Sequence, residues 1–311
     1  MSTVTYVFPG QGTQRAGMIR AIGNDLDEVR DVFEMASDLS HRDVLDLCTN
    51  QSDEELSKTE NTQLVVTTMN LAFLKLLDKR GVKPDVVMGQ SLGQFSAVTA
   101  AGSMDTENTL RLIVKRAELM SKVTRKGVLC SILGLPVDTV ISTMKEVPES
   151  LGGLEVALIN TDKQVVLGGD ENAIDKAAEL MAQRGAFKTV KVRVNQAFHT
   201  TFMKEIESDL ADFVDSLPMT EPSCRMLLNC KGDYADSVED IRQDMKMATC
   251  HTVMWANSLS RLFENPDLAI AEVGMGKTMS GLIRNMGYKS KIYLMSEPRD
   301  LFEFTKLATK G

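Results

Sequence analysis

The chain alternates between short apolar runs and longer stretches in which apolar residues recur every three or four positions. The first pattern predicts buried strands, and the second predicts amphipathic helices. Strands are expected at residues 4–8, 85–88, 226–228 and 268–273, and helices at 62–79, 95–101, 202–217 and 253–263. Strands that lead directly into a loop or a helix are typical of an α/β chain with a largely parallel sheet.

The middle of the chain follows a different order. Strands are expected at 128–133, 155–159, 164–167 and 188–194, and helices at 137–147 and 171–184. The order strand, helix, strand, strand, helix, strand is that of a ferredoxin-like split βαβ unit. We therefore predict an α/β-hydrolase-like large subdomain formed by residues 1–126 and 200–311, with a ferredoxin-like small subdomain inserted at 127–199.

Composition narrows the class of protein. With 43% hydrophobic and 25% charged residues, the 311-residue chain can bury a large core. The net charge of −8 disfavours a nucleic-acid surface, and the five cysteines are scattered without a Cys-x-x-Cys pair. No run approaches the roughly 18 apolar residues of a membrane helix. We expect a monomeric cytoplasmic enzyme that binds neither nucleic acid nor membrane.

The segment Gly89-Gln90-Ser91-Leu92-Gly93 fits the Gly-x-Ser-x-Gly elbow, in which a serine occupies a strained turn between a strand and a helix. The pattern alone is weak, because an ordinary tight turn can carry it. Its context strengthens it, since an apolar strand precedes Ser91 and an alanine-rich helix follows. Amides at a helix N-terminus favour developing negative charge. Ser91 is therefore the expected nucleophile.

A serine nucleophile needs a base, and the chain has three histidines. His199 follows the last predicted strand of the insertion, where the chain re-enters the large subdomain and a cleft is expected. We expect His199 to be the base, the alternative being a structural histidine held by hydrogen bonds. His41 lies in a polar segment and is expected on the surface.

Further landmarks follow in order along the chain. They are Phe8-Pro9-Gly10-Gln11-Gly12, Thr62-Gln63, the elbow, Arg116-Ala117-Glu118-Leu119-Met120, Ile132-Leu133-Gly134-Leu135, Asn160 with Gln164-Val165-Val166, Ala197-Phe198-His199-Thr200, Asn229, Trp255, Glu272-Val273-Gly274-x-Gly276 and Gly281-Leu282. With them, the chain from Phe8 to about Arg284 resembles the malonyl-CoA:acyl-carrier-protein transacylases and the related acyltransferase domains of polyketide synthases.

This resemblance implies a ping-pong reaction. Ser91 would attack the thioester of malonyl-CoA while His199 takes its proton, and backbone N–H groups of Gln11 and Leu92 would hold the oxyanion. The malonyl group would then pass from Ser91 to the phosphopantetheine thiol of an acyl carrier protein. The implied substrates are malonyl-CoA and acyl carrier protein, with no metal and no redox cofactor.

The resemblance also implies a pocket for the malonyl group. Arg116 would pair bidentately with its free carboxylate, the alternative being a structural arginine on a helix surface. The ring of Phe198 would leave little room for an α-methyl branch. Gln63 would line the pocket unless it only packs within its helix, and Gln90 would lie in the same pocket.

The chain departs from the family pattern in three places, the third of which covers two residues. Gln90 stands where the family usually has His, and Gln94 where it usually has Glu; both can hydrogen-bond, so we expect the elbow to survive. His251 and Thr252 replace the usual Asn and Pro. In the family, the main-chain carbonyl at the first of these positions orients the catalytic histidine, and His251 can supply a carbonyl as well.

Two clusters of basic residues are candidate surfaces for an acidic carrier protein. They are Lys188, Lys191 and Arg193 on the last strand of the insertion, and Arg284, Lys289 and Lys291 after Gly281. Each residue taken alone can equally be solvated surface charge.

Other functions are open at this point. An acyl hydrolase that clears carrier proteins would use the same serine and histidine, although a buried Arg116 has no role with neutral acyl chains. The acyltransferase subunit of a malonate decarboxylase would act on another carrier. A lipase would need an acid residue between serine and histidine. An inactive docking subunit would have no use for a nucleophile with its base.

Overall fold

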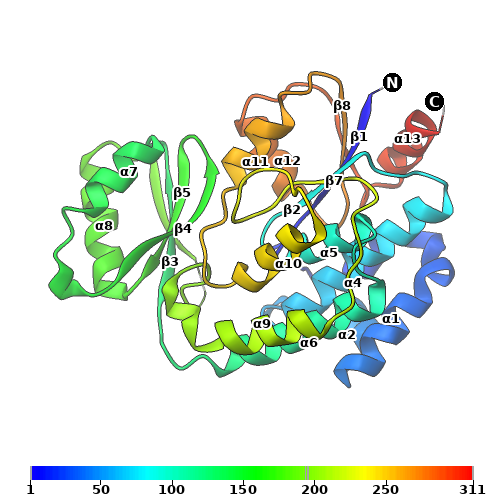
Figure 1. Ribbon diagram of the computed structural model, residues 1–311, viewed down its shortest axis with the longest axis horizontal. Helices are drawn as coiled ribbons and strands as arrows, with labels where there is room; N and C mark the ends of the chain where they lie inside the picture. The colour runs from blue at the N-terminus through cyan, green and yellow to red at the C-terminus, as the bar shows by residue number, and fades with distance from the viewer. Residues whose placement is uncertain (1, 193, 195, 310–311) are drawn as a thin grey trace.

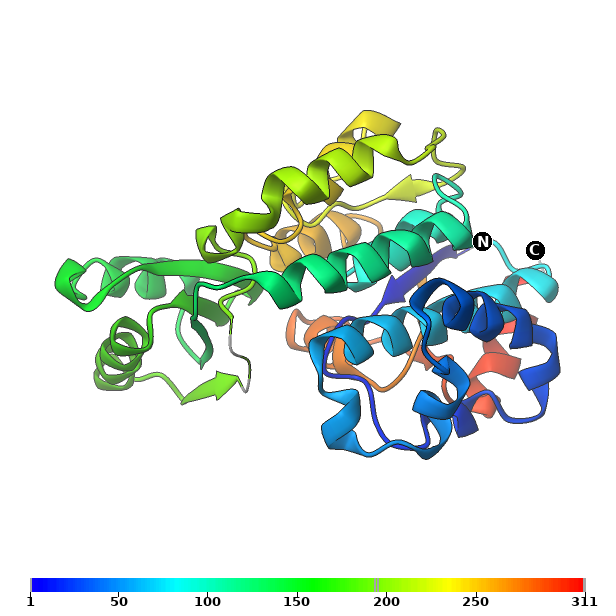
Figure 2. The same cartoon turned by 90° about the horizontal axis from the view of Figure 1, so that it is seen from below.

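The computed structural model describes residues 2–192, 194 and 196–309 of the chain. Two separate sheets organise it, one of five strands in the order β7-β2-β1-β8-β9 and one of four strands in the order β4-β5-β3-β6 (Figure 1). The smaller sheet and its helices project from one end of the larger body, as Figure 2 shows from below. The described N- and C-terminal ends lie at the other end.

The large sheet is parallel at every paired strand. Its strands are β1 (Thr3–Phe8), β2 (Val86–Gly89), β7 (Arg225–Met226), β8 (Leu268–Glu272) and β9 (Ile292–Leu294). Side chains along β1 alternate between two apolar clusters, with Tyr6 and Phe8 in one and Val7 in the other. Both faces of the central strands are therefore buried, which explains their continuous apolar runs.

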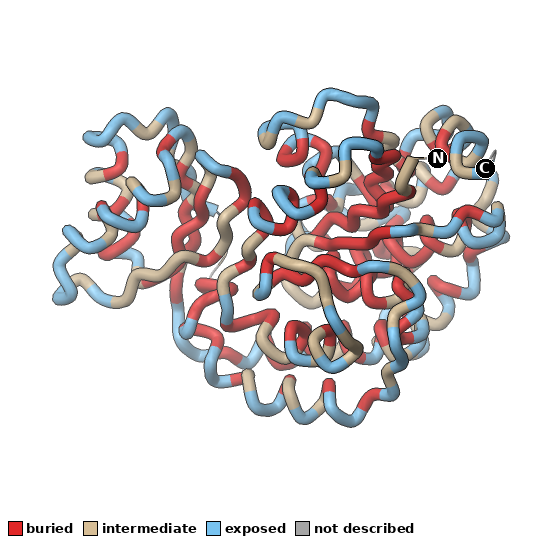
Figure 3. The backbone as a smooth tube through the Cα atoms, turned by 45° about the horizontal axis from the view of Figure 1, so that its top comes forward, coloured by how far each residue is buried: buried red, intermediate tan, exposed pale blue. Residues whose placement is uncertain are grey.

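Helices cover both faces of this sheet. They are α1 (Leu26–Ser40), α2 (Val44–Asn50), α3 (Asp53–Leu56), α4 (Thr59–Lys79), α5 (Gly93–Ala100), α6 (Thr106–Lys122), α9 (Glu207–Ser216), α10 (Val238–Met247), α11 (Trp255–Leu262), α12 (Thr278–Asn285) and α13 (Pro298–Ala308). Helix α4 is buried on nearly all sides from Asn61 to Leu77. Figure 3 shows buried backbone throughout this body.

The small sheet is antiparallel. It is built from β3 (Val128–Leu133), β4 (Leu154–Thr161), β5 (Gln164–Gly169) and β6 (Lys188–Val192), with α7 (Val137–Met144) and α8 (Glu171–Gln183) packed on one face. The strand order is that of a split βαβ unit. The predicted α/β architecture, a parallel sheet with an inserted ferredoxin-like unit, is confirmed. The boundaries at residues 127 and 199 stay a prediction.

The small sheet is joined to the large subdomain through its edge strand β4. Ile159 N–H donates to Val253 O (2.9 Å), and Val253 N–H donates to Ala157 O (3.0 Å). These bonds keep Val253 extended, so the helix predicted from residue 253 begins only at Trp255.

Other predicted elements also differ from the structure. The helix predicted at 202–217 is a 3-10 turn (Thr201–Ile206) followed by α9, and the strand predicted at 226–228 is the two-residue β7. The strand predicted at 188–194 ends as β6 at Val192. Several elements are not among the predicted ones, namely α1, α2, α3, α6, α10, α12, α13 and β9. Across residues 2–192, 194 and 196–309, none of the helices has the length and apolar character needed to cross a membrane.

Candidate active site

The Gly-x-Ser-x-Gly segment forms a sharp turn between β2 and α5. Ser91 adopts a left-handed backbone conformation with φ of 52°, which is uncommon for a residue with a side chain. A Cβ at Gly89 would lie 2.1 Å from the carbonyl carbon of Gly93, and one at Gly93 would lie 2.1 Å from Phe8 O. The elbow therefore requires both glycines, and it presents Ser91 at the carboxyl edge of the parallel sheet.

Asn229, which follows β7, holds the elbow with its buried side chain. Its Oδ1 accepts a hydrogen bond from Ser91 N–H (2.7 Å), and its Nδ2 donates to Gly89 O (2.6 Å). The sequence marks Asn229 only as a family landmark without a role. No local signal reveals the contact, because 138 residues separate Asn229 from Ser91.

His199 faces Ser91 across the site. Its Nε2 lies 2.7 Å from Ser91 Oγ, within hydrogen-bonding distance of a base and its nucleophile. His199 also has a positive φ, of 63°, and its N–H donates to Thr249 O (2.8 Å). The structure thus brings together the nucleophile and the base that the sequence predicts, across 108 residues.

Burial keeps His199 neutral. The pKa of His199 falls from its ordinary 6.5 to about 3, first because the ring is buried and second because the charge of Arg116 acts on it. The main-chain carbonyls of Ala248 and His251 raise the pKa and partly offset these effects. A neutral imidazole can accept the proton of Ser91.

The other ring nitrogen, Nδ1, has no hydrogen-bond partner among the described residues. The carbonyls of Ala248 and His251 face the ring without meeting hydrogen-bond geometry to Nδ1. The His251 side chain points elsewhere, with Nε2 3.3 Å from Glu207 Oε1 on the surface. Only the main chain of His251 therefore takes part in the site.

Leu92 follows Ser91 in the elbow, and Gln11 lines the same cavity as Ser91. The loop after β1 passes so close to the elbow that a Cβ at Gly10 would lie 2.7 Å from Gln90 O and 3.6 Å from Leu92 N. Within the described part of the chain, neither Gln11 N–H nor Leu92 N–H donates to another group. Both are available to bind an oxyanion.

Arg116, on α6, is 1% exposed. Its Nη1 donates to Gln63 Oε1 on α4, and its guanidinium carbon lies 5.4 Å from the centre of the Phe95 ring. Its Nε has no partner, and no carboxylate of the described residues lies within ion-pair distance. Burial lowers the pKa of Arg116 to about 10. Arg116 is thus a buried cation whose charge no described carboxylate compensates, which is energetically costly.

A cavity of about 680 Å³ lies in front of Ser91 and His199. Its lining comes from both subdomains and includes Gly10, Gln11, Gly12, Thr62, Gln90, Gln196 and Phe198. Gln63 and Arg116 lie outside this lining and contact each other instead. The small subdomain contributes an apolar wall, defined here as Leu129, Leu158, Val166, Val192 and Val194. Alternation along the predicted strands could have indicated this wall, since alternate residues share a face.

The two glutamines that depart from the family pattern occupy different surroundings. Gln90 lines the cavity and donates from Nε2 to Asn160 Oδ1 on β4 (2.8 Å). Gln94 is buried below the elbow and donates from Nε2 to Asp244 Oδ2 (2.9 Å). Both replacements are compatible with a hydrogen-bonded elbow.

Two residues of the predicted basic clusters form ion pairs on the surface. Lys191 forms ion pairs of 3.0 and 2.6 Å with two carboxylates of α8, and Lys291 forms ion pairs of 2.8 and 2.7 Å with two carboxylates of the last helix. The role of the two clusters as a surface for a carrier protein stays a prediction. Arg193 lies outside the described residues.

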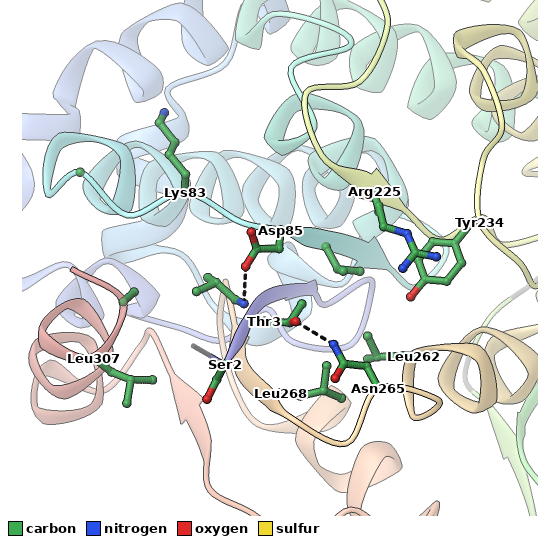
Figure 4. A pocket seen from close by; sticks show the side chains of 14 residues that line it. Ser2, Thr3, Lys83, Asp85, Arg225, Tyr234, Leu262, Asn265, Leu268 and Leu307 are labelled. Atoms are coloured by element: carbon green, nitrogen blue, oxygen red, sulfur yellow. Dashed lines mark hydrogen bonds between the residues drawn. The ribbon is translucent and has the colours of Figure 1, made fainter. Parts of the chain in front are cut away.

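A second cavity, of about 720 Å³, lies at the opposite edge of the large sheet, where the strands begin (Figure 4). Asp85 Oδ2 there accepts a hydrogen bond from Val4 N–H (2.8 Å). The guanidinium carbon of Arg225 lies 3.6 Å from the centre of the Tyr234 ring. No histidine or cysteine is among its described lining residues. In the same described ranges, no group of three or more His, Cys, Asp or Glu side chains is arranged to hold a metal ion.

Residues 5–280 match the family model described as the acyl transferase domain. A curated relative, the polyketide biosynthesis malonyl CoA-acyl carrier protein transacylase PksC of Bacillus subtilis, is 32% identical over 91% of this chain and 96% of its own. The chain belongs to the malonyl-CoA:acyl-carrier-protein transacylase family. It is an acyltransferase, and Ser91 and His199 both lie within the matched residues.

Further members of the transacylase family support this assignment. The malonyl CoA-acyl carrier protein transacylase of Bacillus subtilis is 26% identical over 97% of this chain and 96% of its own. The crystal structure of the malonyl-CoA:acyl carrier protein transacylase from Xanthomonas oryzae has a TM-score of 0.92 and 28% identity, covering 99% of each chain. Another solved structure, a malonyl-transacylase in complex with its type II polyketide-synthase acyl-carrier protein, has a TM-score of 0.93 and 26% identity, covering 98% of this chain and 100% of its own.

Proposed function

We propose that this transacylase moves a malonyl group from malonyl-CoA to the phosphopantetheine thiol of an acyl carrier protein, through a malonyl ester on Ser91. The observation that carries the proposal is Arg116, a buried cation that has no counterion among the described residues and whose charge acts on His199. A substrate carboxylate would supply the missing counterion, and malonyl carries one while neutral acyl groups do not.

The first half-reaction begins at the Ser91–His199 pair. Ser91 Oγ attacks the thioester carbon as its proton passes to His199 Nε2, and the carbonyl oxygen becomes an oxyanion. The amides of Gln11 and Leu92 stabilise that oxyanion. When it collapses, the carbon–sulfur bond breaks, and the departing coenzyme A sulfur takes the proton from His199 Nε2.

The second half-reaction runs through the same atoms. The phosphopantetheine thiol gives its proton to His199 Nε2, and its sulfur attacks the ester carbon. The bond to Ser91 Oγ then breaks, and Oγ takes the proton back. This reaction needs no metal and no redox cofactor, and the carbonyls of Ala248 and His251 would orient the imidazole in place of a triad carboxylate.

Side chains around the cavity would set the choice of acyl group. Gln63 holds one arm of Arg116, which leaves Nε for the malonyl carboxylate. Phe198 is only 7% exposed, and its ring would restrict an α-methyl branch. Gln90 is fixed by Asn160 at the cavity wall and would contact the bound thioester. Action in the cytoplasm as a monomer stays a prediction.

The test is intact-mass measurement after mixing the protein with malonyl-CoA, with and without a phosphopantetheinylated carrier protein. We expect an adduct of one malonyl group that is absent in Ser91→Ala, persists in buffer and moves to the carrier when it is added. Ser142→Ala, an exposed serine of α7, is the matched control and should behave as the parent chain.

Two outcomes would overturn the proposal. If the adduct is lost in buffer without carrier protein as fast as it forms, water is the acceptor and the protein is an acyl hydrolase. A malonyl adduct that still forms on the Ser91→Ala variant would show that Ser91 is not the nucleophile.

A further inference from the structure

The proposed reaction leaves one buried carboxylate beneath the elbow without a role. Asp244, on α10, is 3% exposed and forms no ion pair with any described lysine, arginine or histidine. Burial raises the pKa of Asp244, and hydrogen bonds from Cys230 and Asn229 partly offset this. Burying a carboxylate without an ion pair costs free energy of folding. The hydrogen bonds of Asp244 therefore indicate its role.

Both oxygens of Asp244 accept hydrogen bonds from groups that can only donate. Oδ1 accepts from Cys230 N–H (2.7 Å), and Oδ2 accepts from Asn229 N–H (3.2 Å). Oδ2 also lies 2.9 Å from the amide end of Gln94. Because a carboxylate oxygen offers no proton, Gln94 must turn its NH₂ group toward Asp244.

This orientation is passed on to Ser91. With its NH₂ group turned to Asp244, Gln94 presents Oε1 to Asn229 Nδ2 (2.7 Å). Asn229 therefore presents Oδ1 to Ser91 N–H (2.7 Å). Each amide in the series has one orientation that satisfies all its neighbours. Asp244 fixes that of Gln94, and Gln94 fixes that of Asn229 together with Gly89 O, which also accepts from Asn229 Nδ2 (2.6 Å).

We propose that Asp244 is a positioning residue. It sets the donor-to-acceptor direction of the buried hydrogen-bond series Asp244–Gln94–Asn229 and thereby holds the Ser91 backbone in its left-handed turn. The inference rests on the proposed role of Ser91 as nucleophile. An amide at position 244 would oppose its NH₂ group either to Cys230 N–H or to Gln94, and in the second case Gln94 would turn around. Asn229 would then lose its bond to Gln94, or turn as well, lose its bond to Gly89 O and oppose its own NH₂ to Ser91 N–H.

The same logic explains Gln94, which stands where the family resemblance leads us to expect Glu. A glutamate there would place a second carboxylate against Asp244 in a buried site, where like charges cannot both be ionised. A glutamate at position 94 paired with an asparagine at position 244 restores the polarity, because the contact between the two side chains again joins a donor to an acceptor. One carboxylate is required, and either position can hold it.

The experiment compares the parent chain with Asp244→Asn, Gln94→Glu and the double variant, all of nearly unchanged volume. The measured quantities are the rate constant for forming the malonyl adduct on Ser91 and the KM for malonyl-CoA. We expect each single variant to slow acylation by about 10- to 100-fold, the effect of one unsatisfied buried group, with KM changed by less than about threefold. The double variant should recover at least about tenfold over Asp244→Asn.

The matched control is Glu272→Gln, which alters another buried carboxylate that holds only backbone and Ser280 groups at α12. It should lower the melting temperature without changing the acylation rate constant. If a single variant fails to fold, recovery of folding in the double variant gives the same evidence of coupling.

The inference would be overturned if the two single-variant losses in acylation rate simply multiplied in the double variant. It would also be overturned if Asp244→Asn left the acylation rate constant unaltered. Neither result would affect the proposed function. Absence of any adduct in the parent chain would instead overturn the proposed function.

Discussion

The two sheets that border the cavity differ in how completely they are buried. The parallel sheet is covered on both faces, and its elbow is fixed by bonds to Asn229 and by close packing of Gly93 against Phe8. The antiparallel sheet is covered by helices on one face only, and its other face supplies the apolar wall. Val192 on that wall is 40% exposed.

This difference separates two tasks. Reacting atoms need positions fixed to a fraction of an ångström, and the enclosed sheet provides them. On the proposed function, the wall would receive a long, flexible substrate arm, which needs shape and apolar character, and an open sheet face has both. Changes in the large sheet should therefore affect folding and chemistry, whereas changes in the wall should affect binding.

The largest effect is expected for Gly93→Ala in the enclosed sheet. The new Cβ would lie 2.1 Å from Phe8 O, a backbone atom that cannot move aside alone. We expect a loss of about 3 kcal/mol or more in the free energy of unfolding, measured by urea denaturation. Gly281→Ala is the control, because a Cβ there meets nothing within 4 Å and alanine favours the helix. Equal stabilities of the two variants would contradict the close packing at the elbow.

Arg116→Ala should separate charged from neutral substrates. The malonyl carboxylate would lose its partner, so we expect kcat/KM for malonyl-CoA to fall by about 100-fold, in line with a buried charged hydrogen bond. Transfer from acetyl-CoA should change little. Steady-state kinetics with both thioesters provide the measurement, and equal losses for the two would remove Arg116 from substrate recognition.

Acid should weaken the large subdomain through His199. Its pKa is about 3 in the folded protein and near 6.5 when unfolded, so between these values the unfolded chain binds a proton that the folded chain does not. The free energy of unfolding should thus fall as the pH drops below about 6.5. Urea titrations at pH 7 and pH 5 should show a smaller loss for His199→Gln. A flat profile for the parent chain would argue against a buried neutral imidazole.

The smallest effect is expected for Val192→Thr on the apolar wall. The side chains are nearly isosteric, so only a polar hydroxyl is added to the surface. We expect the KM for the carrier protein to rise by about two- to fivefold with kcat unchanged. Thr189→Val, on the opposite face of the same strand, is the control. A changed kcat would mean that the wall also positions the reacting atoms.

The sequence predicted the fold well where its patterns were local. The apolar run at residues 4–8 and the glycine spacing around Ser91 depend on neighbours, and the structure agrees with both. Helices such as α1 carry charged residues on most turns and reveal only a partial apolar stripe. The short strand β7 is extended mainly because it pairs with β2, and no local sequence pattern predicts this pairing.

Site residues follow the same division. Ser91 and His199 stand out by motif and scarcity, and the structure brings them together. Asp244 looks like one of many acidic residues on an amphipathic helix, and only the folded chain places it under the elbow. Gln63 contacts Arg116 instead of lining the cavity, a distinction that depends on side-chain direction.

The long separations at the elbow have a consequence for biosynthesis. Ser91 is joined to His199 across 108 residues and to Asn229 across 138. While the chain is being made, the serine emerges early, but its base and its backbone anchor emerge only after the whole inserted subdomain. On the proposed mechanism, Ser91 of a nascent chain therefore lacks its base. It can accept an acyl group only after the last third of the protein has folded against the large sheet.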